Sequence, residues 1–154
     1  MTNDSCEISA ISAERLTTII RDDVPFVGRL GVSVVELAAG YAHLRLAFSD
    51  QLLRPGGTIA GPALFGLADV ALFGAVMSKI GEVPLAVTVD MSISFLRKPD
   101  PAPVDAVCDL LKLGRRLAYG TVTLTSVGDP RPVAHATGHY AIPSDRVGEV
   151  KKGG

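Results

Sequence analysis

The segment from Gly61 to Ser78 restricts the possible folds of this chain more than any other. It reads Gly-Pro-Ala-Leu-Phe-Gly-Leu-Ala-Asp-Val-Ala-Leu-Phe-Gly-Ala-Val-Met-Ser, and Asp69 is its one charged residue. Gly61 suits a helix N-cap, and Pro62 suits the first helical position, where a missing N–H costs no hydrogen bond. A lysine and a glycine just beyond the segment suit the last turn and the C-cap. We therefore predict one long helix over about 61–80.

A helix that is apolar on every side must be enclosed on every side. The acid at its centre and the proline near its start argue against a membrane span, so no membrane insertion is expected. Apolar residues make up 47% of the 154-residue chain and charged residues 20%, and such a surplus is commonly hidden between subunits. We expect a curled sheet around the helix, and a homo-oligomer.

The other predicted elements are short and are separated by glycine and proline. Ser12 is predicted to cap a short helix that ends at about Arg21 and is closed off by Pro25. Ile11 and Leu16 are placed as a hydrophobic staple at its start. Apolar or alternating stretches predict strands over residues 31–37, 41–48, 85–95, 104–113, 116–127 and 131–142. This order predicts a single α+β domain with an antiparallel sheet wrapped around one helix, a core over about 24–142 and a frayed tail over 144–154.

The predicted strand over 85–95 alternates most regularly. Its apolar face, predicted to be buried, carries Val87, Val89, Met91, Ile93 and Phe95, whereas the opposite face carries Thr88, Asp90, Ser92 and Ser94. This pattern indicates a long, half-buried strand.

Charge and cysteine usage exclude several classes of function. With 15 basic and 16 acidic residues and no long basic block, the chain is not expected to bind nucleic acid. Cys6 and Cys108 lie far apart and no secretory leader is recognisable, so we expect a cytoplasmic protein without a disulfide. His43, His135 and His139 lack the spacing and the acidic or cysteine neighbours of a metal site, so no metal is expected.

Asp69 is the main candidate for chemistry, because a carboxylate is rarely left inside an apolar helix without a partner or a task. It could act as a general base or nucleophile in a dry pocket, or it could be a structural acid paired with a basic residue across an interface. The glycine-rich stretch over 54–61 favours catalysis, since a helix N-terminus offers backbone N–H groups to a developing oxyanion. An ordinary flexible loop is the alternative interpretation of those glycines.

The spacing of Gly61 and Asp69 limits where a shared site could lie. The two are eight residues apart, which is roughly 12 Å along one helix. One carbonyl group cannot meet both. If both act on the same substrate atom, Asp69 must come from a second, antiparallel copy of the helix, and the active site must lie between subunits.

The order of elements, the segment from Gly61 to Asp69 and the strand from Thr88 to Arg97 resemble the hotdog-fold acyl-CoA thioesterases, particularly the phenylacetic-acid-degradation type, over about residues 24–142. The resemblance implies that the Gly61 N–H polarises a thioester carbonyl and that Asp69 of the partner subunit acts as nucleophile or general base. It implies that Thr88 helps to place the water. It also implies a dimer or a dimer of dimers, an acyl-CoA substrate and no cofactor, coenzyme A being part of the substrate.

The chain departs from the family pattern just before the predicted helix. Arg54 stands where the family has Asn, and Ala60-Gly61-Pro62 replaces His-Gly-Gly. The resemblance also nominates basic residues for the coenzyme A nucleotide. The candidate substrate-binding residues are Arg54, Gly57, Ala60, Pro62, Phe65, Arg97, Lys98, Arg115 and Arg116.

The sequence thus predicts hydrolysis of an acyl-CoA, with an aryl or a medium- to long-chain acyl group, to free acid and coenzyme A. The alternative is a weakly active or non-catalytic hotdog protein that binds acyl-CoA or another apolar ligand, because the loop Asn and the His before the helix are missing. A dehydratase of this fold would need a His with an acid partner near the helix, and the sequence shows no such pair there.

Overall fold

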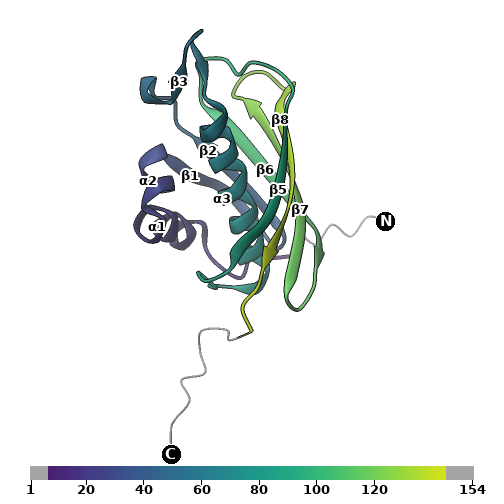
Figure 1. The fold of residues 1–154 in the computed structure, drawn as a ribbon. Coiled ribbons are helices and arrows are strands. Elements are labelled where there is room, and N and C mark those ends of the chain that lie inside the picture. Colours follow the sequence, from purple (N-terminus) through teal and green to yellow (C-terminus); the bar gives the residue numbers. More distant parts are fainter. Residues whose placement is uncertain (1–6, 145–154) are drawn as a thin grey trace, which may run out of the picture.

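A six-stranded antiparallel sheet curves around the helix α3 (Gly61–Ile80) in the computed structural model, which describes residues 7–144 (Figure 1). The strand order is β1-β2-β6-β7-β8-β5, which leaves β1 and β5 at the two edges. The strands are β1 (Val32–Ala38), β2 (Tyr41–Leu46), β5 (Val87–Phe95), β6 (Val104–Leu113), β7 (Leu117–Ser126) and β8 (Pro132–Ala141). The predicted antiparallel sheet around one central helix is therefore confirmed.

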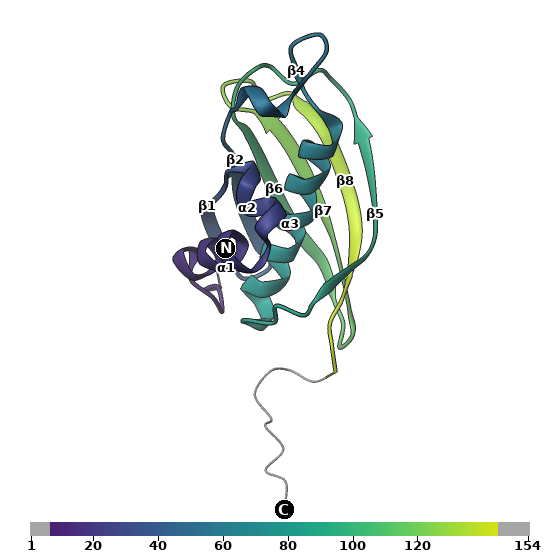
Figure 2. The same ribbon diagram turned by 60° about the vertical axis from the view of Figure 1, so that its left-hand side comes forward.

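Two N-terminal helices, α1 (Ala13–Asp23) and α2 (Pro25–Leu30), lie beside β1 and α3 on the side that the sheet leaves open (Figure 2). Ser12 caps α1 as predicted, because its side chain accepts a hydrogen bond from the Arg15 N–H at 3.0 Å. A β-carbon on Gly74 of α3 would lie 3.0 Å from Leu16 Cδ2, so α1 packs closely on the central helix. The sheet and this helix pair together enclose α3.

The prediction that Pro25 closes off the first helix was incomplete. Helix α1 ends at Asp23, and Pro25 occupies the first position of α2, where its missing N–H removes no helical hydrogen bond. The sequence reading also missed a 3₁₀ turn (Asp50–Leu52) and the short hairpin of β3 (Leu53–Arg54) and β4 (Thr58–Ile59). Of the predicted tail, residues 145–154 lie outside the described residues.

The long apolar helix has its predicted span, but its N-cap lies one residue earlier than predicted. Ala60 is the N-cap, so Gly61 and Pro62 are the first two helical residues rather than the cap and the first residue. Gly81 is the C-cap, and its N–H donates to the Met77 carbonyl at 2.9 Å. Helix α3 is long and apolar enough to cross a membrane, but 72% of its most apolar window is buried within the described fold.

A pair of glycines allows α3 to approach the sheet closely. Gly120 on β7 and Gly138 on β8 are cross-strand partners beneath Leu72 of the helix. A β-carbon on Gly138 would lie 2.8 Å from the Asp90 carbonyl oxygen and 3.2 Å from Leu72 Cδ2. Because one of these neighbours is backbone, the contact cannot be relieved by a side-chain rotation alone. The distance between α3 and the sheet therefore depends on both glycines.

We expect Gly138→Ala to lower the free energy of unfolding by about 1–3 kcal/mol, because the added methyl group overpacks the helix–sheet contact. Chemical denaturation of the purified variant measures this change. Thr137→Val, on the opposite face of the same strand, is the matched control and is expected to stay within about 0.5 kcal/mol of wild type. Equal stability of Gly138→Ala and wild type would contradict the close approach.

Candidate active site

The carboxylate of Asp69 is held by two hydroxyl groups from the sheet. Its Oδ1 accepts a hydrogen bond from Thr88 Oγ1 at 2.7 Å and another from Tyr140 OH at 2.8 Å. The side chain of Asp69 is partly buried. Within residues 7–144, neither hydrogen bond nor ion pair involves Oδ2. Within the described part of one protomer no basic residue pairs with Asp69, so the alternative of a structural acid paired with a basic residue across an interface stays a prediction.

A β-bulge places Thr88 on the face that looks at Asp69. On β5, Met91, Ile93 and Phe95 pair with inward-facing residues of β8, as the alternation predicts. The register then shifts between Thr88 and Asp90, so that one residue is left over and Thr88 pairs with Tyr140. Thr88 thereby joins the helix-facing side rather than the polar face to which simple alternation assigns it.

The same bulge, together with the edge position of β5, makes part of the predicted burial of this strand wrong. Val87, Val89 and Phe95 are exposed at 59%, 56% and 53%, whereas Met91 and Ile93 are only partly buried. An edge strand has a neighbour on one side alone, and α3 covers only its inner face.

Tyr140 is a site residue that the sequence reading missed. It is 4% exposed, it comes from the end of β8, and its ring packs against Phe73 with centroids 6.2 Å apart. Burial, and next the charge of Asp69, raise the pKa of its hydroxyl far above the usual range, so it remains a proton donor. The available signal was a tyrosine among small residues on the inward face of the last strand.

An apolar cavity of about 160 Å³ opens beside Asp69. Helix α2 and the segment before β5 form its walls together with α3. The lining residues are Val24, Val27, Asp69, Val70, Phe73, Pro84, Ala86, Val87, Thr88 and Tyr140. A carboxylate facing such a surface is suited to act on a polar group that carries an apolar substituent.

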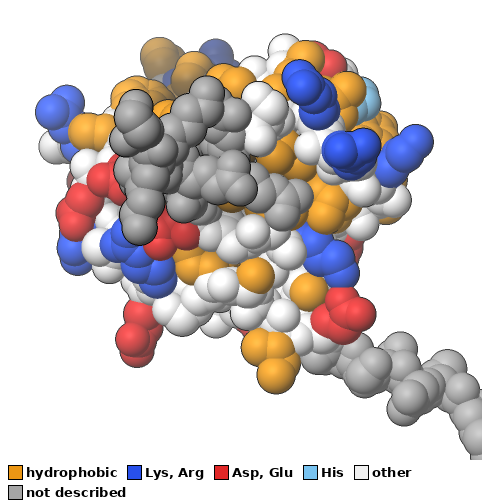
Figure 3. Space-filling model, turned by 90° about the horizontal axis from the view of Figure 1, so that it is seen from below, with side chains coloured by type: hydrophobic (Ala, Val, Ile, Leu, Met, Phe, Trp, Pro, Cys, Tyr) orange, Lys and Arg blue, Asp and Glu red, His pale blue; other side chains and the backbone are white. Residues whose placement is uncertain are grey.

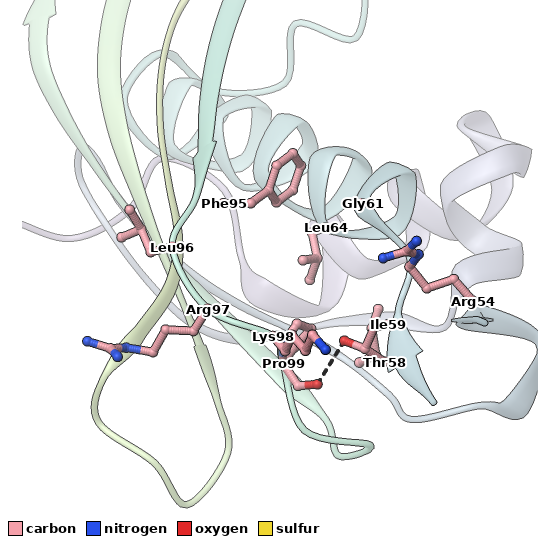
Figure 4. Close-up of a pocket in the computed structure, with 10 residues that line it drawn as sticks. All are labelled: Arg54, Thr58, Ile59, Gly61, Leu64, Phe95, Leu96, Arg97, Lys98 and Pro99. Carbon is pink, nitrogen blue, oxygen red and sulfur yellow. Dashed lines mark hydrogen bonds between the residues drawn. The ribbon is translucent and has the colours of Figure 1, made fainter. Parts of the chain in front are cut away.

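A larger cavity, of about 490 Å³, lies at the N-terminal end of α3 (Figure 4). It is lined by Arg54, Thr58, Ile59, Gly61, Leu64, Phe95, Leu96, Arg97, Lys98 and Pro99. The Gly61 N–H makes no hydrogen bond within the described part of the chain, as expected for the first residue of a helix. A β-carbon at Gly61 would lie 3.3 Å from Phe95 Cζ, so only glycine leaves this approach open.

The two cavities share no lining residue, and one protomer therefore does not bring Gly61 and Asp69 to the same point. This agrees with their helical separation of roughly 12 Å. In Figure 4 the guanidinium of Arg54 points toward the helix start, whereas the side chain of Arg97 points away from it. Lys98 lies close to Thr58, which donates a hydrogen bond to the Pro99 carbonyl at 3.1 Å.

The four basic candidates do not gather within one protomer. Arg97 and Lys98 follow the end of β5, but Leu117, next to Arg115 and Arg116, aligns through Ala141 with the start of β5. Figure 3 looks onto the end of the molecule that carries this hairpin, and Lys and Arg side chains lie on both sides of this face. The two pairs are thus separated by the length of β5, roughly 30 Å for its nine residues.

The remaining nominated residues surround the helix start without meeting Asp69. Gly57 sits in the β3–β4 turn with a φ of 73°, a conformation that favours glycine. Ala60 is the N-cap and offers no side-chain hydrogen bond, and Pro62 is the second helical residue. Phe65 is 38% exposed on α3 and lines neither cavity.

The histidines and the described cysteine take no part in this site. Each histidine has a partner on the sheet: His43 Nε2 lies 3.2 Å from Asp105, His135 Nδ1 lies 3.3 Å from Thr123, and His139 Nδ1 lies 3.1 Å from Asp90. No group of three metal-binding side chains occurs among residues 7–144. Burial, and next the charge of Asp109, raise the pKa of the Cys108 thiol far above its ordinary value.

The comparisons with known proteins agree with this fold. The sequence profile of the thioesterase superfamily matches residues 56–133, and the chain belongs to that family. A structure from Silicibacter sp. TM1040, provisionally assigned as a thioesterase, is 37% identical and has a TM-score of 0.80, with 91% of this chain and 96% of that chain covered. These matches identify the fold as the hotdog fold of the PaaI type.

Two further relatives support the same conclusion. A mutant structure of the phenylacetic acid degradation protein PaaI from Thermus thermophilus is 31% identical, with a TM-score of 0.68 and coverage of 77% of this chain and 99% of that chain. A provisionally assigned esterase from Saccharolobus solfataricus is 26% identical over 113 residues, which are 73% of this chain and 74% of that protein. Family membership supports thioester hydrolysis in general.

We expect Cys108 to resist thiol reagents in the native protein, because it is buried on β6 and little thiolate forms. In a Cys6→Ser variant, whose substituted position lies outside the described residues, labelling should be on the order of a hundredfold slower than after unfolding in urea. The measurement is the rate of reaction with a chromogenic disulfide at pH 8. Labelling of the native and unfolded forms at the same rate would contradict the burial of this strand.

Proposed function

We propose that this protein is an acyl-CoA thioesterase whose active site lies between two protomers. One observation carries the proposal: α3 and β5 run in opposite directions along each other. Gly61 at the helix start lies against Phe95 at the strand end, and Asp69, two turns on, is hydrogen-bonded to Thr88 near the strand start. Each protomer thus holds an N–H donor and a carboxylate at opposite ends of one edge strand.

The exposed edge of β5 supports pairing with a second copy of the chain. This strand pairs with β8 on one side only, and large apolar side chains are exposed on it and just before and after it. They are Leu85, Val87, Val89, Phe95 and Leu96. A free apolar edge is a template for strand pairing. Antiparallel pairing of two β5 strands about their midpoint would place the Gly61 end of one protomer beside the Asp69 end of the other.

In this arrangement the chemistry is direct hydrolysis. The Asp69 carboxylate of the partner subunit takes a proton from water while the water oxygen attacks the thioester carbon, or the carboxylate itself attacks and the acyl-enzyme anhydride is then hydrolysed. The negative charge that develops on the carbonyl oxygen is met by the Gly61 N–H at the positive end of α3. In both routes the C–S bond breaks when this tetrahedral intermediate collapses, which in the second route forms the anhydride, and the coenzyme A thiolate takes up a proton. No metal or cofactor enters this scheme.

The two ends of the substrate have separate places in the proposed dimer. The apolar cavity beside Asp69 suits the acyl group, because its walls are mainly aliphatic and aromatic. Pairing of the β5 edges would also bring Arg115 and Arg116 of the partner subunit to the end that carries Arg97 and Lys98. These four residues, together with Arg54 at the cavity, offer cationic groups to the nucleotide phosphates. A cytoplasmic location and a dimer or dimer of dimers complete the proposal.

Asp69→Asn should lower kcat by about 10²–10⁴-fold, since the amide can neither accept a proton nor attack. Steady-state hydrolysis of a panel of aryl- and fatty-acyl-CoAs, followed by release of the free thiol, measures this. Asp23→Asn, an exposed carboxylate at the end of α1, is the matched control and should retain wild-type rates.

Equal rates for wild type and Asp69→Asn would refute the assignment of this carboxylate. Calorimetric binding of an acyl-CoA without any turnover by wild type would instead favour the non-catalytic alternative. That alternative has a specific basis in Arg54 and Ala60, which replace the family's Asn and His.

The position of the site between protomers can be tested by mixing variants in one dimer. Gly61→Val places a side chain against Phe95 and should abolish activity, as should Asp69→Asn. Co-expression of the two should restore about a quarter of wild-type activity, because half of the dimers are mixed and one of their two sites is intact. A site within one protomer would leave every chain broken, so co-expression would restore nothing.

A further inference from the structure

The strongest unassigned feature of the site is Tyr140, and the geometry points to a positioning role for it. We propose that Tyr140, together with Thr88, fixes the Asp69 carboxylate by binding Oδ1, so that Oδ2 is the oxygen presented to the reaction. This inference rests on the proposed function for the reaction itself. The contact between the two side chains stands on the described geometry alone.

The two donors converge because of the sheet register. Thr88 and Tyr140 are direct cross-strand partners on β5 and β8, and both face α3. Such partners have β-carbons about 4.5–5.5 Å apart, close enough for two hydroxyls to meet one oxygen. Their distances to Asp69 Oδ1 are 2.7 Å and 2.8 Å. One carboxylate oxygen is therefore occupied from two strands, and the other is left for water or substrate.

The surroundings of Tyr140 favour a fixed rather than a mobile donor. Its ring is buried against Phe73, and its hydroxyl also lies 3.3 Å from the Asp69 backbone carbonyl. The phenol stays protonated at every pH at which the enzyme could work, because burial and the neighbouring carboxylate oppose its ionisation and raise its pKa. A permanent donor keeps its hydrogen bond to Asp69 Oδ1 and limits rotation of the carboxylate.

The chemical consequence is a carboxylate whose orientation is fixed. Because Oδ1 is held from two strands, Oδ2 keeps one direction toward the reacting group, and that alignment is lost when the carboxylate can rotate. Loss of the Tyr140 hydroxyl should therefore slow the chemical step more than it weakens substrate binding.

The test is Tyr140→Phe, which removes one oxygen and keeps the ring that packs on Phe73. We expect kcat to fall roughly tenfold with KM within about twofold of wild type, because the hydrogen bond orients the reacting carboxylate and does not bind substrate. Tyr119→Phe is the matched control, because Tyr119 stacks on His139 away from Asp69. It should change neither kcat nor KM.

The partner donor gives a second pair of variants. Thr88→Val removes the other hydroxyl in an isosteric side chain and should lower kcat with little change in KM, whereas Thr88→Ser keeps the donor and should retain most of the wild-type kcat. Because both donors bind one oxygen, the double variant Tyr140→Phe/Thr88→Val should deviate from the sum of the single effects. Additive single effects would overturn the shared-oxygen arrangement.

A measurement without turnover separates this inference from the proposed function. The carboxyl ¹³C signal of Asp69, assigned by its absence in Asp69→Asn, can be compared at neutral pH in folded wild type and in Tyr140→Phe. A change in its chemical shift that Tyr119→Phe does not produce supports the hydrogen bond whatever the substrate. An unchanged signal in Tyr140→Phe overturns the inference. Absence of hydrolysis by wild type would refute the proposed thioesterase, not the contact.

Discussion

Everything in this structure depends on enclosing an apolar helix that carries one carboxylate. Helix α3 is covered by the curved sheet on one side and by α1 and α2 on the other, and its leucines and its methionine are fully buried. A carboxylate at position 69 would be costly in such surroundings without partners. The fold meets this cost with two hydroxyl donors from the sheet and with a cavity that opens at the same point. The Asp69 carboxylate that the core must accommodate is thus also the group that is available for chemistry.

Close packing and the site geometry depend on each other. Gly120 and Gly138 let Leu72 approach the backbone of β7 and β8, and Leu72 lies less than one helical turn after Asp69. The depth to which α3 sinks therefore determines whether the carboxylate can reach Tyr140 at the end of β8. If α3 lay further from the sheet, it would keep part of its hydrophobic contacts but would lose the two hydrogen bonds to Asp69.

The sequence predicts the local elements well and the register poorly. The span of α3 follows from its uniform apolarity and from glycine and proline at its ends, and Ser12 follows from ordinary capping chemistry. The helix-facing position of Thr88 does not follow from the sequence, because alternation predicts the opposite face. The bulge exists only in the pairing of β5 with β8. Tyr140 was missed for the same reason. Its partner lies 71 positions away, and only tertiary contacts join the two.

The opposite directions of α3 and β5 explain why the proposed active site needs two chains. Because the helix start lies at the strand end, the N–H donor and the carboxylate sit at opposite ends of one edge, and folding of a single protomer cannot join them. A two-fold axis through the middle of that edge exchanges its ends. The same operation brings the basic hairpin of one chain to the basic strand end of the other. Symmetry would then complete both the reactive pair and the anion-binding groups, which makes association a condition of activity.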